Sequence, residues 1–334
     1  MNEANKPRTT AQDVANLAGV SRSAVSRYFN GGQKVSLEKR ERILAAAEKL
    51  GYRPNAIARS LTGRQTDLVA VVIADNESFH TSRIVRELYL QLYDVGKRAL
   101  IIPVGNTDGI DESSLRALDY QADAIVVIGG SVSRGIVDHL RAANTPLFLL
   151  GRENVDAEVV GVCCDNFLGA QMLGRLLVRS GRRRLTYIGK AINTFSNQNR
   201  REGFVSEIES AGVGLYAETS DATTFEGGRN AAIRLLGMPE PPDAIFAFND
   251  TMALGALSAV SEFKLRVPDD VAVVGFDDIP MAGWPNFQLT TVRYDIKKVT
   301  RIVARSIVGH TDHQSAENGN IMVTPELVVR ITAL

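Results

Sequence analysis

The sequence predicts two folds in one chain, a small all-α helix-turn-helix headpiece and a larger α/β core made of two lobes. Three observations predict this organisation. The first 50 residues hold three short helical segments separated by glycines and capping residues. From residue 68 onward, uninterrupted apolar strands alternate with helical segments, which is typical of parallel sheets covered on both faces. A chain of 334 residues is also longer than one simple core usually holds.

Two short helices joined by a tight turn are expected over 11–18 and 22–29. Thr10 opens a capping-box-like sequence, TAQD, and Gly19 can adopt the positive φ that a sharp turn requires. Ser21 is a suitable N-cap for the second helix. The inner face of the first helix is predicted to consist of Val14, Leu17 and Ala18.

A third helix is expected to begin after Ser36 and to end at Gly51, where a C-cap glycine belongs. Two short helices braced by a third form the helix-turn-helix pattern. The inner stripe of this third helix is predicted to be Ile43, Leu44, Ala47 and Leu50.

The second helix separates apolar from polar positions, which favours a DNA-recognition role. A helix of this kind inserts its N-terminal half into the major groove. Arg22 and Arg27 are the expected base readers, because arginine can bond guanine bidentately. Ser23 is a candidate third base reader. The residues expected to fix phosphates and register are Ser21, Ser26 and Asn30.

The distribution of charge supports a polyanionic partner for the headpiece. Residues 1–64 hold 12 basic and 5 acidic residues, whereas the remainder holds 26 and 33. A basic head on an acidic body is typical of a head that meets nucleic acid.

No apolar run approaches the roughly 20 residues of a membrane helix, and the first residues lack the apolar core of a signal peptide. We therefore expect a cytoplasmic protein without membrane contact.

The core should bind a small molecule where its strands end. The expected strands are LVAVVIA, ALIIPV, AIVVIG, PLFLLG, LTYIGK, AIFAFN and VAVVGF. Ligands of such sheets bind beyond the carboxyl ends of the strands. Polar pairs stand there at 75–76, 249–250 and 277–278. Each pair alone more often caps a helix or turn, but together they would line one cleft. Cys163 and Cys164 are interpreted as buried apolar residues rather than a disulfide.

Long segments of the chain resemble the LacI/GalR (lactose-repressor-like) family of transcriptional regulators. In the headpiece the matching segments are DVANLAGVS, AVSRYFN, RERILAA and LGYRPNAIARSL. In the core, NRREGF, FNDTMALGALSAV and VPDDVAVVGFDD resemble the periplasmic-binding-protein-like part of the same family. The resemblance runs nearly to the C-terminus and implies a Rossmann-like core of two lobes.

The resemblance implies three parts in the chain. Residues 8–54 would form the helix-turn-helix domain, 55–65 a hinge helix and linker, and 66–334 the effector-binding core. Lobe 1 would comprise about 66–161 and 292–322, and lobe 2 about 162–291 and 323–334. We expect a homodimer, which matches a near-palindromic double-stranded operator.

The hinge helix is expected over 56–62, after Pro54. In the family this helix forms when two subunits meet on DNA, and a leucine from each wedges into the minor groove. That leucine is Leu61 here, and Arg59 would lie near the DNA backbone; Asn55, the expected N-cap, completes the DNA-binding set. The alternative for Leu61 is a small apolar contact between head and body.

The effector site implied by the resemblance contains Arg200, Asn249 and Asp277, with Phe79 as an apolar lid. The family loop close to N-P-F-F reads Glu77-Ser78-Phe79-His80 here, which puts that side of the pocket in doubt. A sugar or sugar derivative is the expected effector. Three basic residues also raise the hypothesis of an acidic or phosphorylated ligand, namely Lys190, Arg200 and Arg201.

The predicted function is therefore a sequence-specific DNA-binding transcriptional regulator, a repressor by the family's usual output, controlled by an effector between two lobes. The alternative is a sugar-binding-type protein without a DNA role. An enzyme is not expected, because no dinucleotide, P-loop or nucleophile-elbow motif is found. No cofactor or metal is predicted, since the pair His310 and His313 lacks a third ligand of matching pattern.

Overall fold

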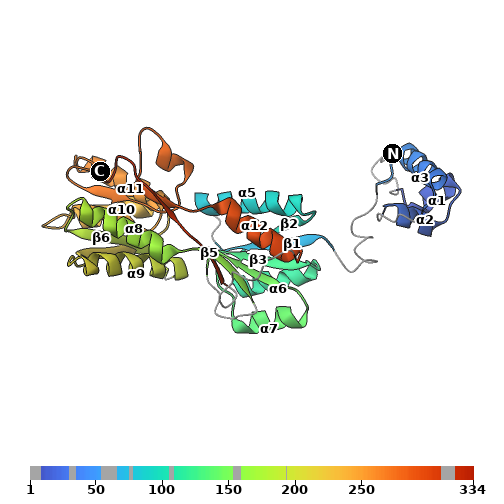
Figure 1. The fold of residues 1–334 in the computed structure, drawn as a ribbon, viewed down its shortest axis with the longest axis horizontal. Coiled ribbons are helices and arrows are strands. Elements are labelled where there is room, and N and C mark those ends of the chain that lie inside the picture. The colour runs from blue at the N-terminus through green and yellow to red at the C-terminus, as the bar shows by residue number, and fades with distance from the viewer. Residues whose placement is uncertain are drawn as a thin grey trace, which may run out of the picture. The chain divides into compact units, whose positions relative to one another are not determined.

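The structure is a computed structural model of the chain, and it describes residues 9–29, 35–53, 66–74, 78–104, 109–152, 159–192, 194–309 and 320–334. The chain forms two compact units, residues 1–66 and 67–334. The first is all-α and the second is α/β with parallel sheets, so the predicted fold class is confirmed (Figure 1).

The headpiece contains the three predicted helices, α1 (Ala11–Ala18), α2 (Arg22–Phe29) and α3 (Leu37–Leu50). Thr10 and Asp13 form a reciprocal capping box at the start of α1. Gly19 and Gly51 both end helices with a φ of 62°, a conformation that glycine adopts without the steric penalty of a Cβ. The local punctuation of the sequence therefore determines where these helices begin and end.

The inner faces of α1 and α3 differ from the prediction at two positions. Leu17 and Leu44 are each 46% exposed, whereas Ala15 and Ala46 are buried. In each helix the leucine and the alanine are two positions apart, about 200° around the helix axis, so they lie on nearly opposite faces and the alanine faces inward. Alanines at the contact allow three short helices to pack closely around Val14, Val25 and Ile43.

The first lobe of the core is a six-stranded sheet in the order β11-β5-β4-β3-β1-β2. All its pairings are parallel. One face is covered by α5 (Phe79–Asp94) and α12 (Ile296–Ile307), and the other by α6 (Ile110–Asp119) and α7 (Arg134–Ala142). The strands are β1 (Leu68–Ile73), β2 (Arg98–Pro103), β3 (Ala124–Ile128), β4 (Leu147–Leu150), β5 (Val160–Cys164) and β11 (Asn320–Val323).

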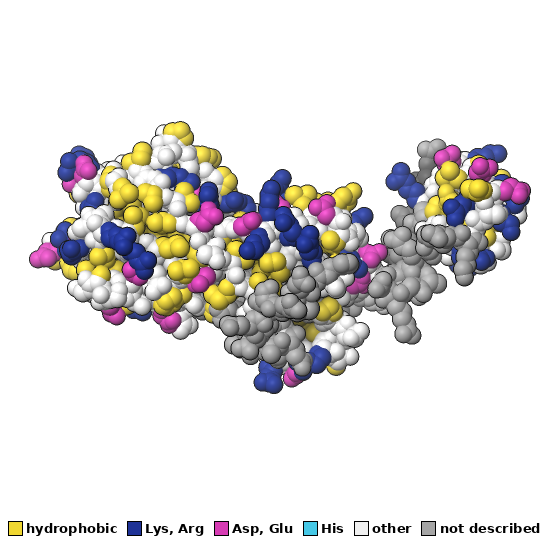
Figure 2. Space-filling model, viewed as in Figure 1, with side chains coloured by type: hydrophobic (Ala, Val, Ile, Leu, Met, Phe, Trp, Pro, Cys, Tyr) yellow, Lys and Arg dark blue, Asp and Glu magenta, His cyan; other side chains and the backbone are white. Residues whose placement is uncertain are grey.

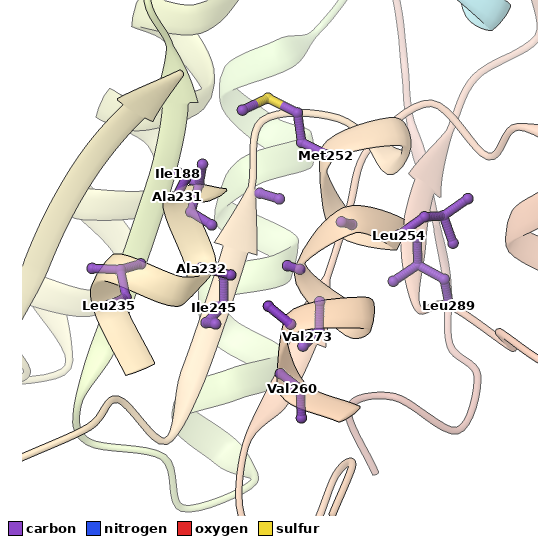
Figure 3. Packing of buried hydrophobic residues seen from close by; sticks show 14 of the residues in the cluster. Ile188, Ala231, Ala232, Leu235, Ile245, Met252, Leu254, Val260, Val273 and Leu289 are labelled. Carbon is purple, nitrogen blue, oxygen red and sulfur yellow. The ribbon is translucent and has the colours of Figure 1, made fainter. Parts of the chain in front are cut away.

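The second lobe is a four-stranded parallel sheet in the order β7-β6-β8-β9. Helices α8 (Asn166–Arg179) and α9 (Phe195–Ser210) cover one face. Helices α10 (Phe225–Leu236) and α11 (Asp250–Glu262) cover the other, over a core of aliphatic side chains (Figure 3). A short 3-10 helix, η1 (Pro280–Gly283), follows the last strand of this sheet along the chain, β9. The strands are β6 (Leu185–Lys190), β7 (Ala217–Asp221), β8 (Ala244–Ala247) and β9 (Ala272–Val274).

The chain crosses between the lobes more than once. Strand β5 pairs entirely within the first sheet, so the first crossing follows Cys164. After β9, the chain returns through β10 (Thr291–Arg293) to α12, and after β11 it reaches the second lobe through β12 (Glu326–Val328). Strands β10 and β12 pair with each other in an antiparallel ribbon.

Helix α12 shows how one sequence serves both the core and the surface. Its apolar face, with Val299 and Val303, is buried against the first sheet. Its other face exposes Lys297, Lys298, Arg301 and Arg305, and basic side chains gather over this helix in Figure 2. Among the described residues, no helix combines the length and the apolar character needed to cross a membrane.

Candidate DNA-binding helix and effector site

Helix α2 has the surface predicted for a recognition helix. Ala24 and Val25 are buried against α1 and α3, while Arg22, Ser26 and Arg27 are exposed. Ser21 caps the helix, because its Oγ accepts a hydrogen bond of 3.2 Å from the backbone N of Ala24. The apolar side of α2 is thus used for packing, and its polar side is available to a partner.

Two hydrogen bonds organise the polar side of α2. The Oγ atoms of Ser21 and Ser23 lie 2.9 Å apart, and Arg27 donates from Nε to the carbonyl oxygen of Ser23 at 3.1 Å. A guanidinium has five N–H groups, and this bond uses the one nearest the chain.

Several predicted residues lie outside the described residues. These are Asn30 of the headpiece, the hinge residues Asn55, Arg59 and Leu61, the polar pair at 75–76, and His310 and His313. Among the residues that the structure describes, no group of three or more His, Cys, Asp or Glu side chains could hold a metal ion.

A cavity of about 90 Å³ lies between the two lobes of the core, at the carboxyl ends of the strands. One buried water occupies about 10–15 Å³ of such a cavity. The cavity therefore has room for a small molecule and not for a polymer. Hydroxyl, amide, aromatic and charged groups share the wall. The lining residues that the description below uses are Ser78, His80, Thr81, Cys164, Asn166, Lys190, Thr194, Ser196, Arg200, Phe248, Asn249, Asp277 and Tyr294.

Arg200 lines this cavity and is held by three hydrogen bonds. Its side chain donates to Asn166 Oδ1 at 2.8 Å, to the carbonyl oxygen of Phe248 at 2.7 Å and to Asp277 Oδ1 at 2.9 Å. Its guanidinium carbon also lies 3.7 Å from the ring centroid of Phe276. Both members of the Arg200–Asp277 ion pair are buried, so the charge of Arg200 is compensated within the protein.

Asn249 and Asp277 also line the cavity, at the positions where β8 and β9 end. Asn249 caps α11 by accepting from the backbone N of Met252 at 3.0 Å, which leaves its amide nitrogen as the group it can offer a ligand. Asp277 has a φ of 107°, a left-handed conformation that side chains rarely adopt. Such an orientation is typical of residues held for a specific role.

Asp250 fixes the turn that carries Asp277. This fully buried carboxyl group accepts from Thr291 Oγ1 at 2.5 Å and from the backbone N of Ile279 at 2.8 Å. Burial raises its pKa well above the ordinary value, and the nearby carboxylate of Asp277 raises it further. Asp250 thus joins α11, β10 and the segment after Asp277 through one side chain.

Phe79, the predicted apolar lid of the effector site, is not part of the cavity wall. Phe79 is 53% exposed and does not line the cavity, whereas the next residue, His80, does. Ser78 caps α5 by accepting from the backbone N of Thr81, so α5 begins at Phe79. The roughly 100° step between neighbouring helical residues then turns His80 inward and Phe79 outward.

His80 and Tyr294 form a buried pair at the edge of the cavity. His80 Nε2 lies 2.8 Å from the hydroxyl oxygen of Tyr294, and the two rings meet edge to face with centroids 5.4 Å apart. Burial lowers the pKa of His80, although Asp277 opposes this shift, and burial raises the pKa of Tyr294. Both groups are therefore neutral at neutral pH.

The three basic residues behind the acidic-ligand hypothesis do not act together. Arg201 does not line the cavity, and it forms an exposed ion pair with Glu218. Arg200 is compensated by Asp277. Lys190 does line the cavity, so only two of the three basic residues, Arg200 and Lys190, belong to its wall.

Sequence reasoning missed several residues of the wall, among them His80, Asn166, Thr194, Ser196 and Tyr294. Asn166 follows β5 directly, so the rule that found Asn249 and Asp277 could also have found it. Thr194 caps α9 after β6, which is the same signal. Tyr294 lies on a crossover between lobes, and no local pattern indicates its position.

Comparisons with known proteins match both units. The family described as bacterial regulatory proteins, lacI family, matches residues 10–55, and the periplasmic binding protein-like domain matches residues 175–333. The HTH-type transcriptional regulator GalS of Salmonella typhimurium is 32% identical over 299 residues, which cover 88% of this chain and 87% of GalS.

Solved structures share the whole fold. The lac repressor bound to ONPG in the repressed state has a TM-score of 0.87 and 26% identity, covering 98% of this chain and 100% of that one. The transcriptional regulator CelR in complex with cellobiose has a TM-score of 0.70 and 28% identity, covering 97% and 100%. The chain therefore belongs to the lacI family of bacterial regulatory proteins, as a helix-turn-helix transcription regulator with an effector-binding core.

Proposed function

We propose that this protein is a repressor that binds a near-palindromic operator as a homodimer and is controlled by a small polar effector between its lobes. The observation that carries the proposal is the division of α2, whose buried Ala24 and Val25 leave Arg22 and Arg27 exposed on one face. A partner on chromosomal DNA places the protein in the cytoplasm. The proposal assigns residues 8–54 to DNA binding, 55–65 to the hinge, and the remainder to effector binding.

Replacement of Arg27 by alanine should weaken specific DNA binding by about 1–3 kcal/mol, or roughly 5- to 150-fold, because a bidentate contact to guanine is lost. Fluorescence anisotropy with an operator obtained by selection from genomic fragments measures this. Lys49→Ala is the control, since it removes one positive charge from α3 and not from α2. Equal losses in the two variants would indicate a general charge effect, and a protein that only binds sugars would have no specific binding to lose.

The homodimer is proposed to use an apolar groove between α5 and β2. The groove contains Val85, Tyr89, Ala99 and Ile101, and the side chains of Tyr89 and Ile101 are 49% and 44% exposed. Exposed apolar residues that gather in this way are typical of an interface. The second occupant is another copy of the chain, because a two-fold operator requires two heads.

Tyr89→Asp should convert the dimer to a monomer at micromolar concentration, because the interface would bury an unpaired carboxylate. Light scattering after size-exclusion chromatography measures the mass. Tyr120→Asp is the control, since Tyr120 is a 57% exposed aromatic residue that caps the C-terminus of α6, away from the groove. A dimer that persists in Tyr89→Asp would exclude this groove as the interface.

The effector is proposed to be a sugar or sugar derivative. The wall supplies the hydroxyl groups of Ser78, Thr81, Thr194 and Ser196 and the amide of Asn249, which suit a ligand with several hydroxyl groups. Ligand binding would change the angle between the lobes, and with it the spacing of the two hinges. Isothermal titration of neutral sugars against sugar acids and sugar phosphates tests the ligand class, and binding of phosphates alone would contradict a neutral sugar.

A further inference from the structure

The first turns of α5, which belong to the first lobe, contact the second lobe directly. Arg83 donates from Nη1 to the carbonyl oxygen of Asp278 at 2.7 Å. His80 Nε2 is bonded to Tyr294 and lies 3.9 Å from Asp277 Oδ1. Residues three positions apart lie on the same face of a helix, so one face of α5 reaches both Asp277 and Asp278.

The turn that receives these contacts is held firmly from its own side. Asp277 and Asp278 both have positive φ values, 107° and 45°, which require support from the surroundings. Arg200 bonds Asp277, and Arg330 donates from Nη2 to Asp278 Oδ1 at 2.7 Å. The same Arg330 donates from Nη1 to the carbonyl oxygen of Leu289 at 2.7 Å. The turn is therefore a fixed support against which α5 can rest.

We infer that Arg83 is a positioning residue that clasps α5 to the Asp277–Asp278 turn, that the bond between His80 and Tyr294 supports it from the same face of α5, and that together they hold the two lobes closed over the cavity. This inference rests on the proposed function, in that the cavity is taken as the effector site. The strength of the clasp then determines how often the cavity opens.

The chain carries its own reporter of opening. Cys164 lines the cavity and is 3% exposed, whereas its neighbour Cys163 is 1% exposed and does not line the cavity. These are the only two cysteines of the chain. A thiol in the wall reacts with a maleimide only when the lobes separate, while Cys163 becomes reactive only when the sheet itself unfolds. Comparison of the two rates separates lobe opening from unfolding.

The experiment measures the rate of N-ethylmaleimide labelling of the full-length protein, without DNA or effector, by intact mass. In a Cys163→Ser background, Arg83→Met and Tyr294→Phe should each speed the labelling of Cys164 by about 2- to 10-fold, the range expected for one lost hydrogen bond. Arg83→Lys keeps a donor on a shorter side chain and should give a smaller increase. Arg141→Met is the matched control, since Arg141 is exposed on α7, which covers the other face of the first sheet, and its rate should equal that of the parent.

Unchanged Cys164 rates in both Arg83→Met and Tyr294→Phe would overturn the clasp. So would an equal increase in Arg141→Met, or an equal acceleration of Cys163 in a Cys164→Ser background, because either would indicate loosening unrelated to the contact. The assay needs neither operator nor effector. Its failure would leave specific DNA binding untouched, and a failure of the Arg27 experiment would leave the clasp untouched.

Discussion

Arg200→Met should lower the free energy of unfolding of the core by about 3–5 kcal/mol, the cost of removing one partner of a buried ion pair. Asp277 would remain buried without its cation, and the carbonyl oxygen of Phe248 and the amide oxygen of Asn166 would each lose a donor. The same change should abolish effector binding, because Asp277 is positioned by this bond. Urea denaturation followed by far-ultraviolet circular dichroism measures the stability.

The matched control for Arg200 is its neighbour on α9. Arg201 pairs with Glu218, and both side chains are substantially exposed. A surface ion pair contributes about 0–1 kcal/mol, so Arg201→Met should leave the urea midpoint nearly unchanged. Similar losses in the two variants would mean that the buried network around Asp277 is not the stabilising feature described above.

Gly255→Ala should destabilise the second lobe by about 1–3 kcal/mol, the range for inserting atoms into a packed core. A Cβ at this position would lie 2.0 Å from the carbonyl oxygen of Phe225 and 2.7 Å from the backbone N of Arg229. Both are main-chain atoms, so α10 and α11 would have to separate along their length. Thermal unfolding monitored by calorimetry should show a lower transition temperature.

A second glycine provides the comparison for Gly255. A Cβ on Gly214 would meet no atom within 4 Å, and its φ is not in the left-handed region. Gly214→Ala should therefore be neutral, or stabilising by about 0.4–1 kcal/mol through the unfolded state. A transition temperature lowered equally by both substitutions would contradict the close approach of the two helices.

The fold could be predicted in detail where capping and turn residues set the ends of a helix. The ends of the headpiece helices are set in this way, each within one turn, by Thr10, Gly19, Ser21 and Gly51. Seven apolar strands were predicted, because both faces of a parallel sheet are buried. Strand β7 was missed, since it lies at a sheet edge and no residue in it is fully buried. The other strands that were missed are β5, β10, β11 and β12, each of three to five residues.

The effector site could be predicted only in part. Arg200, Asn249 and Asp277 follow from the rule on strand ends and from family resemblance, and the structure places all three in the cavity wall. The prediction chose Phe79 where the structure has His80 in the wall, because the exact first residue of α5 determines which of the two neighbours points inward. The inner face of α1 was also predicted wrongly at one position, since Ala15 and not Leu17 is buried. Tyr294 depends on the crossover between lobes, which no single segment encodes.

The most direct test of the DNA-binding account is a competition measurement with the purified full-length protein. Anisotropy of a labelled, selected operator should persist in an excess of random-sequence duplex at moderate salt for the parent protein, and should be lost for the double variant Arg22→Ala/Arg27→Ala. If random duplex displaces the operator as effectively as unlabelled operator does, α2 does not read sequence, and the regulatory account is wrong.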